Sequence, residues 1–119
     1  MSRELTSHKV NGLNEAITID VIDQPGGGGA CHHYVVDLVG IPQTTITFQN
    51  GPLDEVDANG LSNESLLAIV EDRLQGFQNG PYACRENAIA LTKLQEAMMW
   101  LHKRTRDRMA RGVEGTHEV

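Results

Sequence analysis

The sequence lacks the features that mark membrane proteins, disulfide-linked secreted proteins and zinc proteins. No apolar run approaches the roughly 18 residues that cross a bilayer, and the polar start has no apolar segment typical of a signal peptide. The two cysteines, Cys31 and Cys84, lie far apart and form no CxxC pair, so we expect free thiols. These absences favour a cytoplasmic protein with no membrane partner.

Aromatic residues and positive charge are also scarce. Two Phe, two Tyr and one Trp make up 4% of the 119 residues, and the formal net charge is −6. A chain of this length forms one domain with a modest core, and association between copies would bury more apolar surface. The acidic balance disfavours polymeric nucleic acid as a partner, because its binding depends on neutralising many phosphates. A small anionic ligand needs only a few local cations.

The first half of the chain has the pattern of β-structure. Between Ala16 and Gln49, the segments "AITIDVID", "HYVVDLV" and "TTITFQ" alternate or cluster β-branched residues. The links "QPGGGGACH" and "GIPQ" suit turns, so we expect antiparallel strands joined by hairpins. We predict an α+β fold in a single domain over 1–119, with a small antiparallel sheet and connecting loop in 1–61 and a two-helix hairpin in 62–119.

The second half changes to helical spacing. Ser62 or Asn63 can cap a first helix, along which Leu66, Ile69, Val70, Arg73 and Phe77 recur. The sequence "NGP" at 79–81 stops that helix. A second helix is predicted from about Glu86 to about Arg111, with one stripe formed by Leu91, Leu94, Met98, Leu101 and Thr105. The short connection predicts an antiparallel hairpin.

Trp100 lies off the apolar stripe of the second predicted helix, since about 180° separates it from Leu91 at roughly 100° per residue. Another surface must therefore cover it. The N-terminal sheet and a second subunit would both serve.

The end of the second predicted helix concentrates positive charge. Five of the ten basic residues fall between Lys103 and Arg111. Arg104, Arg108 and Arg111 share an arc of about 60° beside the apolar stripe, where paired guanidinium hydrogen bonds could hold a phosphate. The alternative is that these cations complement the helix dipole and stay solvated, or that Asp107 pairs with one of them.

Four further residues near the interhelical turn have two interpretations each. Arg73 and Asn87 stand where the stripes expect apolar side chains, so they either line a polar cleft between the helices or meet water at the bundle edge. Phe77 and Tyr82 flank the turn and either stack on a nucleobase or fill the core there. A nearby amide, aromatics and arginines together would suit a ligand with a base and phosphates.

Other chemistry finds little support. The stretch "PGGGGACHH" lacks the GK[ST] ending of a phosphate loop, which favours a flexible hairpin loop. Cys31, His32 and His33 alternate in direction on a strand and lack a fourth ligand, so we expect no metal and no cofactor. We also expect no catalytic residue, because no nucleophile elbow, HExxH or paired-carboxylate motif is present. The alternatives are a cyclic-nucleotide-hydrolysing enzyme with His102 or a carboxylate as base, and a small nucleic-acid-binding regulator.

The motifs "FQNGP", "LLAIVEDRL", "GFQNGPYACRENA", "WLHKRT" and "RGVEGTH" carry a family resemblance over Phe48–Val119. In these motifs the chain resembles the phage Thoeris anti-defence protein 1 family, and its C-terminal hairpin is also similar to the phage anti-CBASS protein 2 family. The resemblance implies a sponge in the host bacterial cytoplasm that sequesters cyclic ADP-ribose isomers such as glycocyclic ADP-ribose without degrading them. It also implies a homo-oligomer, either a dimer or a hexamer, with ligand pockets between subunits. Some hexameric members also hold CBASS cyclic oligonucleotides at separate sites.

The resemblance also assigns binding residues. It implies that Phe77 walls or stacks on the adenine, that Asn87 hydrogen-bonds a polar edge, and that Arg104 and Arg108 hold the pyrophosphate. Tyr82 stands where relatives are expected to have Phe, and it joins the ligand-binding set as a further aromatic.

Overall fold

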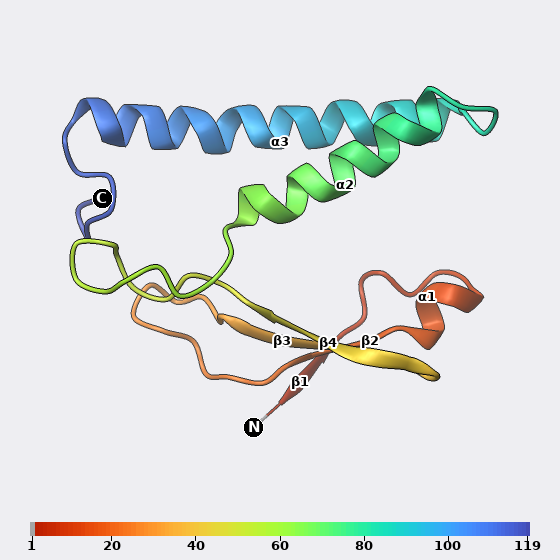
Figure 1. Cartoon of the computed structure of the whole chain (residues 1–119), viewed down its shortest axis with the longest axis horizontal. Coiled ribbons are helices and arrows are strands. Elements are labelled where there is room, and N and C mark those ends of the chain that lie inside the picture. The colour runs from red at the N-terminus through yellow and green to blue at the C-terminus, as the bar shows by residue number, and fades with distance from the viewer. Residues whose placement is uncertain (1) are drawn as a thin grey trace. The chain divides into compact units, whose positions relative to one another are not determined.

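A computed structural model describes residues 2–119 and forms two compact units (Figure 1). The first unit contains the residues up to Gly51 together with Ala58–Leu61, and the second contains Pro52–Asp57 and Ser62–Val119. The first unit holds a sheet and the second holds the helical hairpin, so the α+β fold class is confirmed. None of the helices within residues 2–119 is both long and apolar enough to span a bilayer.

The sheet is antiparallel, with the strand order β1-β2-β3-β4. Its strands are β1 (Arg3–Leu5), β2 (Thr18–Val21), β3 (His33–Leu38) and β4 (Ile41–Thr47). Opposite partners share a face of an antiparallel sheet. Ile19 therefore shares a face with its partners Leu5 and Val36, and Val21 shares it with its partner Tyr34. This is the apolar face, and Val21 is only 1% exposed.

The structure adds two elements that the sequence pattern did not predict, and it moves one turn. β1 and the helix α1 (Gly12–Ala16) precede the first predicted strand. The predicted turn "GIPQ" is wrong in its bounds, because β4 begins at Ile41 and Leu38 pairs with Ile41. The hairpin loop is Val39–Gly40, and Gly40 has a φ of 84°, which favours glycine.

The helical hairpin matches its prediction closely. α2 (Asn63–Gln78) is capped by Ser62, whose hydroxyl accepts from the Ser65 amide in a reciprocal capping box. α3 (Arg85–Ala110) begins and ends one residue from the predicted bounds. The two helices run antiparallel and meet at the turn (Figure 1).

The two helices differ in how well their predicted stripes are covered. On α3, Leu91 is 8% exposed and the other four stripe residues are partly buried, which confirms the stripe. On α2, Ile69 is 65% exposed and Val70 46% exposed. In their place Leu67 and Leu74 are partly covered. The apolar spacing of α2 thus provides more hydrophobic surface than this chain covers.

Candidate functional site

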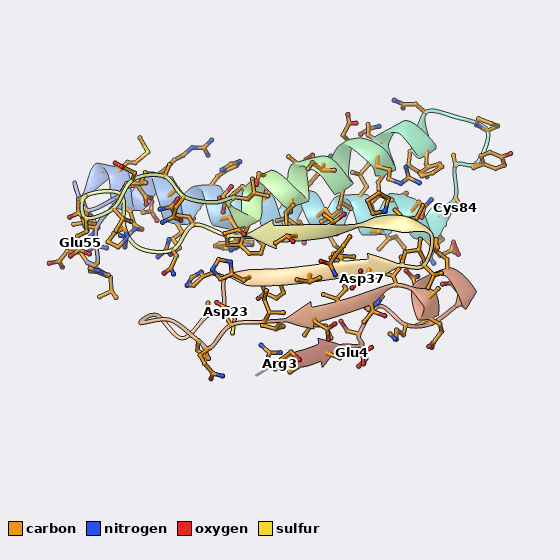
Figure 2. All side chains as sticks on the ribbon, turned by 60° about the horizontal axis from the view of Figure 1, so that its bottom comes forward. Arg3, Glu4, Asp23, Asp37, Glu55 and Cys84 are labelled. Atoms are coloured by element: carbon orange, nitrogen blue, oxygen red, sulfur yellow. The ribbon has the colours of Figure 1, made fainter. Side chains whose placement is uncertain are left out.

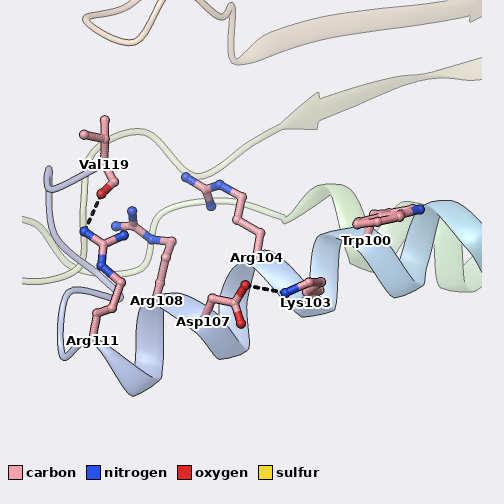
Figure 3. Close-up of a pocket in the computed structure, with 7 residues that line it drawn as sticks. All are labelled: Trp100, Lys103, Arg104, Asp107, Arg108, Arg111 and Val119. Atoms are coloured by element: carbon pink, nitrogen blue, oxygen red, sulfur yellow. Dashed lines mark hydrogen bonds and ion pairs between the residues drawn. The ribbon is translucent and has the colours of Figure 1, made fainter.

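The C-terminal half of α3 forms one wall of an open pocket of about 510 Å³ (Figure 3). The pocket is lined by Trp100, Lys103, Arg104, Asp107, Arg108, Arg111 and Val119. Its volume lies within the range of small-molecule sites, roughly 300–1,000 Å³. The position on the basic helix end gives this pocket four cations and one carboxylate.

The cations of the pocket are not equally available. Lys103 Nζ lies 2.8 Å from Asp107 Oδ2, so these two charges largely offset each other. Arg104 is exposed and, within residues 2–119, has no hydrogen-bond or ion-pair partner. A guanidinium with all five N–H donors unoccupied is well suited to a phosphate. Arg104 is therefore the cation of the pocket that can take an anion without breaking an existing contact.

Arg108 lines the same pocket, but it is only 6% exposed and its guanidinium is hydrogen-bonded within the chain. Its Nη2 donates to the carbonyl oxygens of Val113 at 2.9 Å and Thr116 at 3.1 Å, and its Nη1 donates to the carbonyl of Glu118. Its Nε lies 3.7 Å from the Glu114 carboxylate. A direct contact between Arg108 and a phosphate stays a prediction, since most of its donors are engaged within the chain.

Local backbone chemistry explains why the chain turns back at Arg108. α3 ends in a Schellman motif, in which the Gly112 amide donates to the Met109 carbonyl and the Val113 amide to the Arg108 carbonyl, both at 3.0 Å. Gly112 has a φ of 72°, the left-handed conformation that this motif requires. The following residues therefore return beside the last turns of α3.

The other predicted binding residues lie around the interhelical turn. Phe77, in the last turns of α2, is 38% exposed, and the guanidinium of Arg73 lies 5.0 Å from the centroid of its ring. Asn87 lies in the first turn of α3 and is partly buried, while Tyr82 in the turn is 76% exposed. Arg73 is exposed, which agrees with the alternative that it meets water, and its guanidinium also packs on the ring of Phe77.

Within a single chain, the predicted binding residues at the interhelical turn lie far from the arginines at the end of α3. Seventeen residues of continuous helix separate Asn87 from Arg104, and at 1.5 Å per residue this distance is about 25 Å. Figure 2 shows the same separation, with Cys84 at the turn and Glu55 at the other end of the helical unit. The aromatics and the amide therefore form one candidate subsite, and the arginines form another.

The histidine segment has a structural role in the sheet unit. The carboxylate of Asp23 accepts from the backbone amides of His32 at 2.8 Å and His33 at 3.1 Å, and Cys31 Sγ donates to the Asp23 carbonyl. Desolvation opposes ionisation of Asp23, but the hydrogen bonds from the His32 and His33 amides outweigh it and hold the pKa of Asp23 below its ordinary value. Across residues 2–119, no group of three His, Cys, Asp or Glu side chains could hold a metal ion.

The sequence reasoning missed Trp100 and Lys103 as pocket residues. Trp100 is 69% exposed and lines the pocket beside Arg104, and a second hollow of about 360 Å³ lies on its other side with Met99 and His102. The available signal was the spacing of Trp100, Lys103 and Arg104 at i, i+3 and i+4, which places them on one helix face. An aromatic ring and a guanidinium without a partner in residues 2–119 thus line the same pocket without help from the turn.

The fold and the pocket define a small α+β protein whose C-terminal helical hairpin ends in a basic, anion-attracting pocket. The model of the "Acb2/Tad1, hairpin domain" family matches residues 41–106, more than half of the chain, and the chain belongs to this family. It is also similar to "Thoeris anti-defense 1" of Bacillus phage SBSphiJ7, with 55% identity over 92 residues. That match covers 77% of this chain and 64% of the relative, so the chain spans less than two thirds of that protein's length. The family resemblance of the sequence is confirmed.

Proposed function

We propose that this protein is a phage anti-defence sponge that binds and sequesters a cyclic ADP-ribose isomer, with glycocyclic ADP-ribose as its ligand. The observation that carries the proposal is the guanidinium of Arg104, which has no partner within residues 2–119 and lines the same pocket as Trp100. A pyrophosphate offers the planar sets of oxygen acceptors that an arginine fork binds best. The family membership and the name of the relative support an anti-defence role for the binding.

The ligand is held and not cleaved in this proposal. The pocket contains cations, an indole and one carboxylate that is engaged with Lys103. Its groups can therefore bind an anion, and the proposal assigns none of them a role as acid or base. A protein that removes a signal in the host cytoplasm by binding alone needs several sites or high abundance.

The proposed site is composite and belongs to a homo-oligomer. Asn87 lies about 25 Å along α3 from Arg104, a distance greater than the span of one cyclic dinucleotide. Two hairpins arranged antiparallel would place the turn of one copy against the basic end of the other. The exposed apolar residues of α2, Ile69 and Val70, offer surface for such an association.

The decisive experiment combines native mass spectrometry with recovery of the ligand. The protein is incubated with a panel that contains glycocyclic ADP-ribose, linear ADP-ribose and cyclic di- and trinucleotides. We expect an oligomer carrying glycocyclic ADP-ribose, which returns unmodified after denaturation. Release of a linear or cleaved product would refute the sponge, and no bound nucleotide from the panel would refute the assignment of the ligand class. Cyclic di- or trinucleotides bound together with glycocyclic ADP-ribose would reveal separate sites.

A further inference from the structure

The segment Val113–Glu118 is fastened to the end of α3 by one side chain. The Arg108 guanidinium donates to three backbone carbonyls of this segment, those of Val113, Thr116 and Glu118. The planar guanidinium of Arg108 thereby binds backbone carbonyls that are spread over six residues. No other side chain within residues 2–119 donates hydrogen bonds to as many carbonyls of this segment.

Only arginine fits this position. Its N–H groups point outward in a fixed plane, so they reach carbonyls on several sides at once, whereas a lysine ammonium is a compact donor on a flexible stem. Arg108 is 6% exposed, and a buried charge is tolerated when it is hydrogen-bonded and paired. The three carbonyls and the Glu114 carboxylate meet that demand.

The backbone of the segment is preset for the same arrangement. Gly112 and Gly115 adopt φ angles of 72° and 83°, which disfavour any other residue. The Gly115 carbonyl also accepts from the Asp54 amide at 2.9 Å. The segment is therefore held from both sides, by Arg108 and by the loop that contains Asp54.

We propose that Arg108 is a positioning residue that fastens Val113–Glu118 and thereby holds Val119 in the wall of the pocket. Val119, which directly follows the segment, lines the pocket together with Arg104 (Figure 3). A fastened wall keeps water from one side of the bound phosphates, which strengthens their attraction to Arg104. This inference rests on the proposed function for its ligand, and it makes residues 113–118 a support of the binding site.

The first test is hydrogen exchange without ligand on the wild type, Arg108→Lys and Arg108→Ala. The amides of Val113, Thr116 and Glu118 are hydrogen-bonded in the fastened segment. We expect both variants to exchange these amides faster by about tenfold or more, because lysine keeps the charge but not the fork. Wild-type protection of the segment in Arg108→Lys would overturn the proposal.

The second test loosens the wall without changing any charge. Gly115→Ala forces a side chain into a left-handed backbone conformation, and Gly27→Ala is its control, since a Cβ at Gly27 meets open space. With glycocyclic ADP-ribose as the probe, we expect Gly115→Ala to raise the Kd about tenfold and to leave its salt dependence unchanged. Gly27→Ala should bind as the wild type.

The outcomes of the second test separate the two proposals. A Gly115→Ala variant that exchanges the segment rapidly and yet binds with wild-type affinity would overturn the wall. A wild type that binds no probe would contradict the proposed ligand, while the exchange experiment would still decide whether Arg108 fastens the segment. Helical circular dichroism checks that each variant keeps the hairpin.

Discussion

Replacing Arg104 with alanine should weaken ligand binding strongly without unfolding the hairpin. Arg104 is exposed and has no hydrogen-bond or ion-pair partner within residues 2–119. Its removal therefore leaves no buried group unsatisfied, and surface substitutions of this kind change stability by about 0.5 kcal/mol or less. Any large loss of affinity would come from the lost contact with the ligand.

The size of the loss follows from the chemistry of the contact. A hydrogen bond to a charged group contributes about 1.5–3 kcal/mol, and an arginine fork can form two of them with a phosphate. Because the side chain is exposed before binding, part of this gain offsets its desolvation. A net loss of about 2–3 kcal/mol corresponds to a 30- to 160-fold increase in Kd. Arg104→Lys should lose about five- to tenfold, since the charge remains and the fork does not.

Binding can be measured by the fluorescence of Trp100, the only tryptophan of the chain, which lines the same pocket. The matched control is Arg106→Ala, an exposed arginine of the same helix that does not line this pocket. Both variants change the net charge equally, so a general electrostatic effect would appear in both. Equal losses in Arg104→Ala and Arg106→Ala would refute the specific role of Arg104, as would wild-type affinity in Arg104→Ala.

Three further predictions concern the sheet, the hairpin core and the assembly. Asp23 has a lowered pKa, so its stabilising contribution is present above pH 3.8 and is lost as the pH falls through its folded pKa. Thermal unfolding from pH 2 to 6 should therefore show a smaller loss of stability toward low pH in Asp23→Asn than in the wild type. Leu91→Ala should cost about 2–4 kcal/mol in urea unfolding because Leu91 is 8% exposed, whereas Met99→Ala, at a position 66% exposed, should cost less than about 1 kcal/mol. Mixing Phe77→Ala with Arg104→Ala protein should restore binding if the composite site draws on two copies, and mixtures that stay as inactive as either parent would contradict it.

The helical hairpin was the most predictable part of the fold because its signals are local. The Ser62 cap and the stop after Gln78 act within a few residues of the chain, and the stripe from Leu91 to Thr105 repeats over about four turns. Which apolar residues of α2 are covered was not predictable in the same way. Its apolar residues recur on more than one side, and periodicity does not say which side Leu67 or Ile69 will present to α3.

The candidate site was predictable as a set of residues and not as an arrangement. Spacing placed Arg104 and Arg108 near each other on α3, and the structure brings both into one pocket. It could not show that Arg108 would be buried, because its partners are backbone carbonyls, which any residue of the tail could supply. Short elements failed for a related reason: β1 has three residues and α1 has five, too few for a period to emerge.

The charge of the chain constrains how the proposed ligand is captured. A net charge of −6 repels a diphosphate at long range, but screening limits that repulsion to about 8 Å at physiological salt. Within the pocket, four cations face one carboxylate, so the local charge is positive, and Arg104 is the cation without a partner in residues 2–119. Steering by this local charge raises the association rate, whereas differences in affinity between related complexes arise mostly from dissociation. The pocket wall at Val119, held by residues 113–118, and an aromatic contribution from a second copy both act on dissociation. Variants of either should therefore shorten the residence time of the ligand while leaving its association rate nearly unchanged.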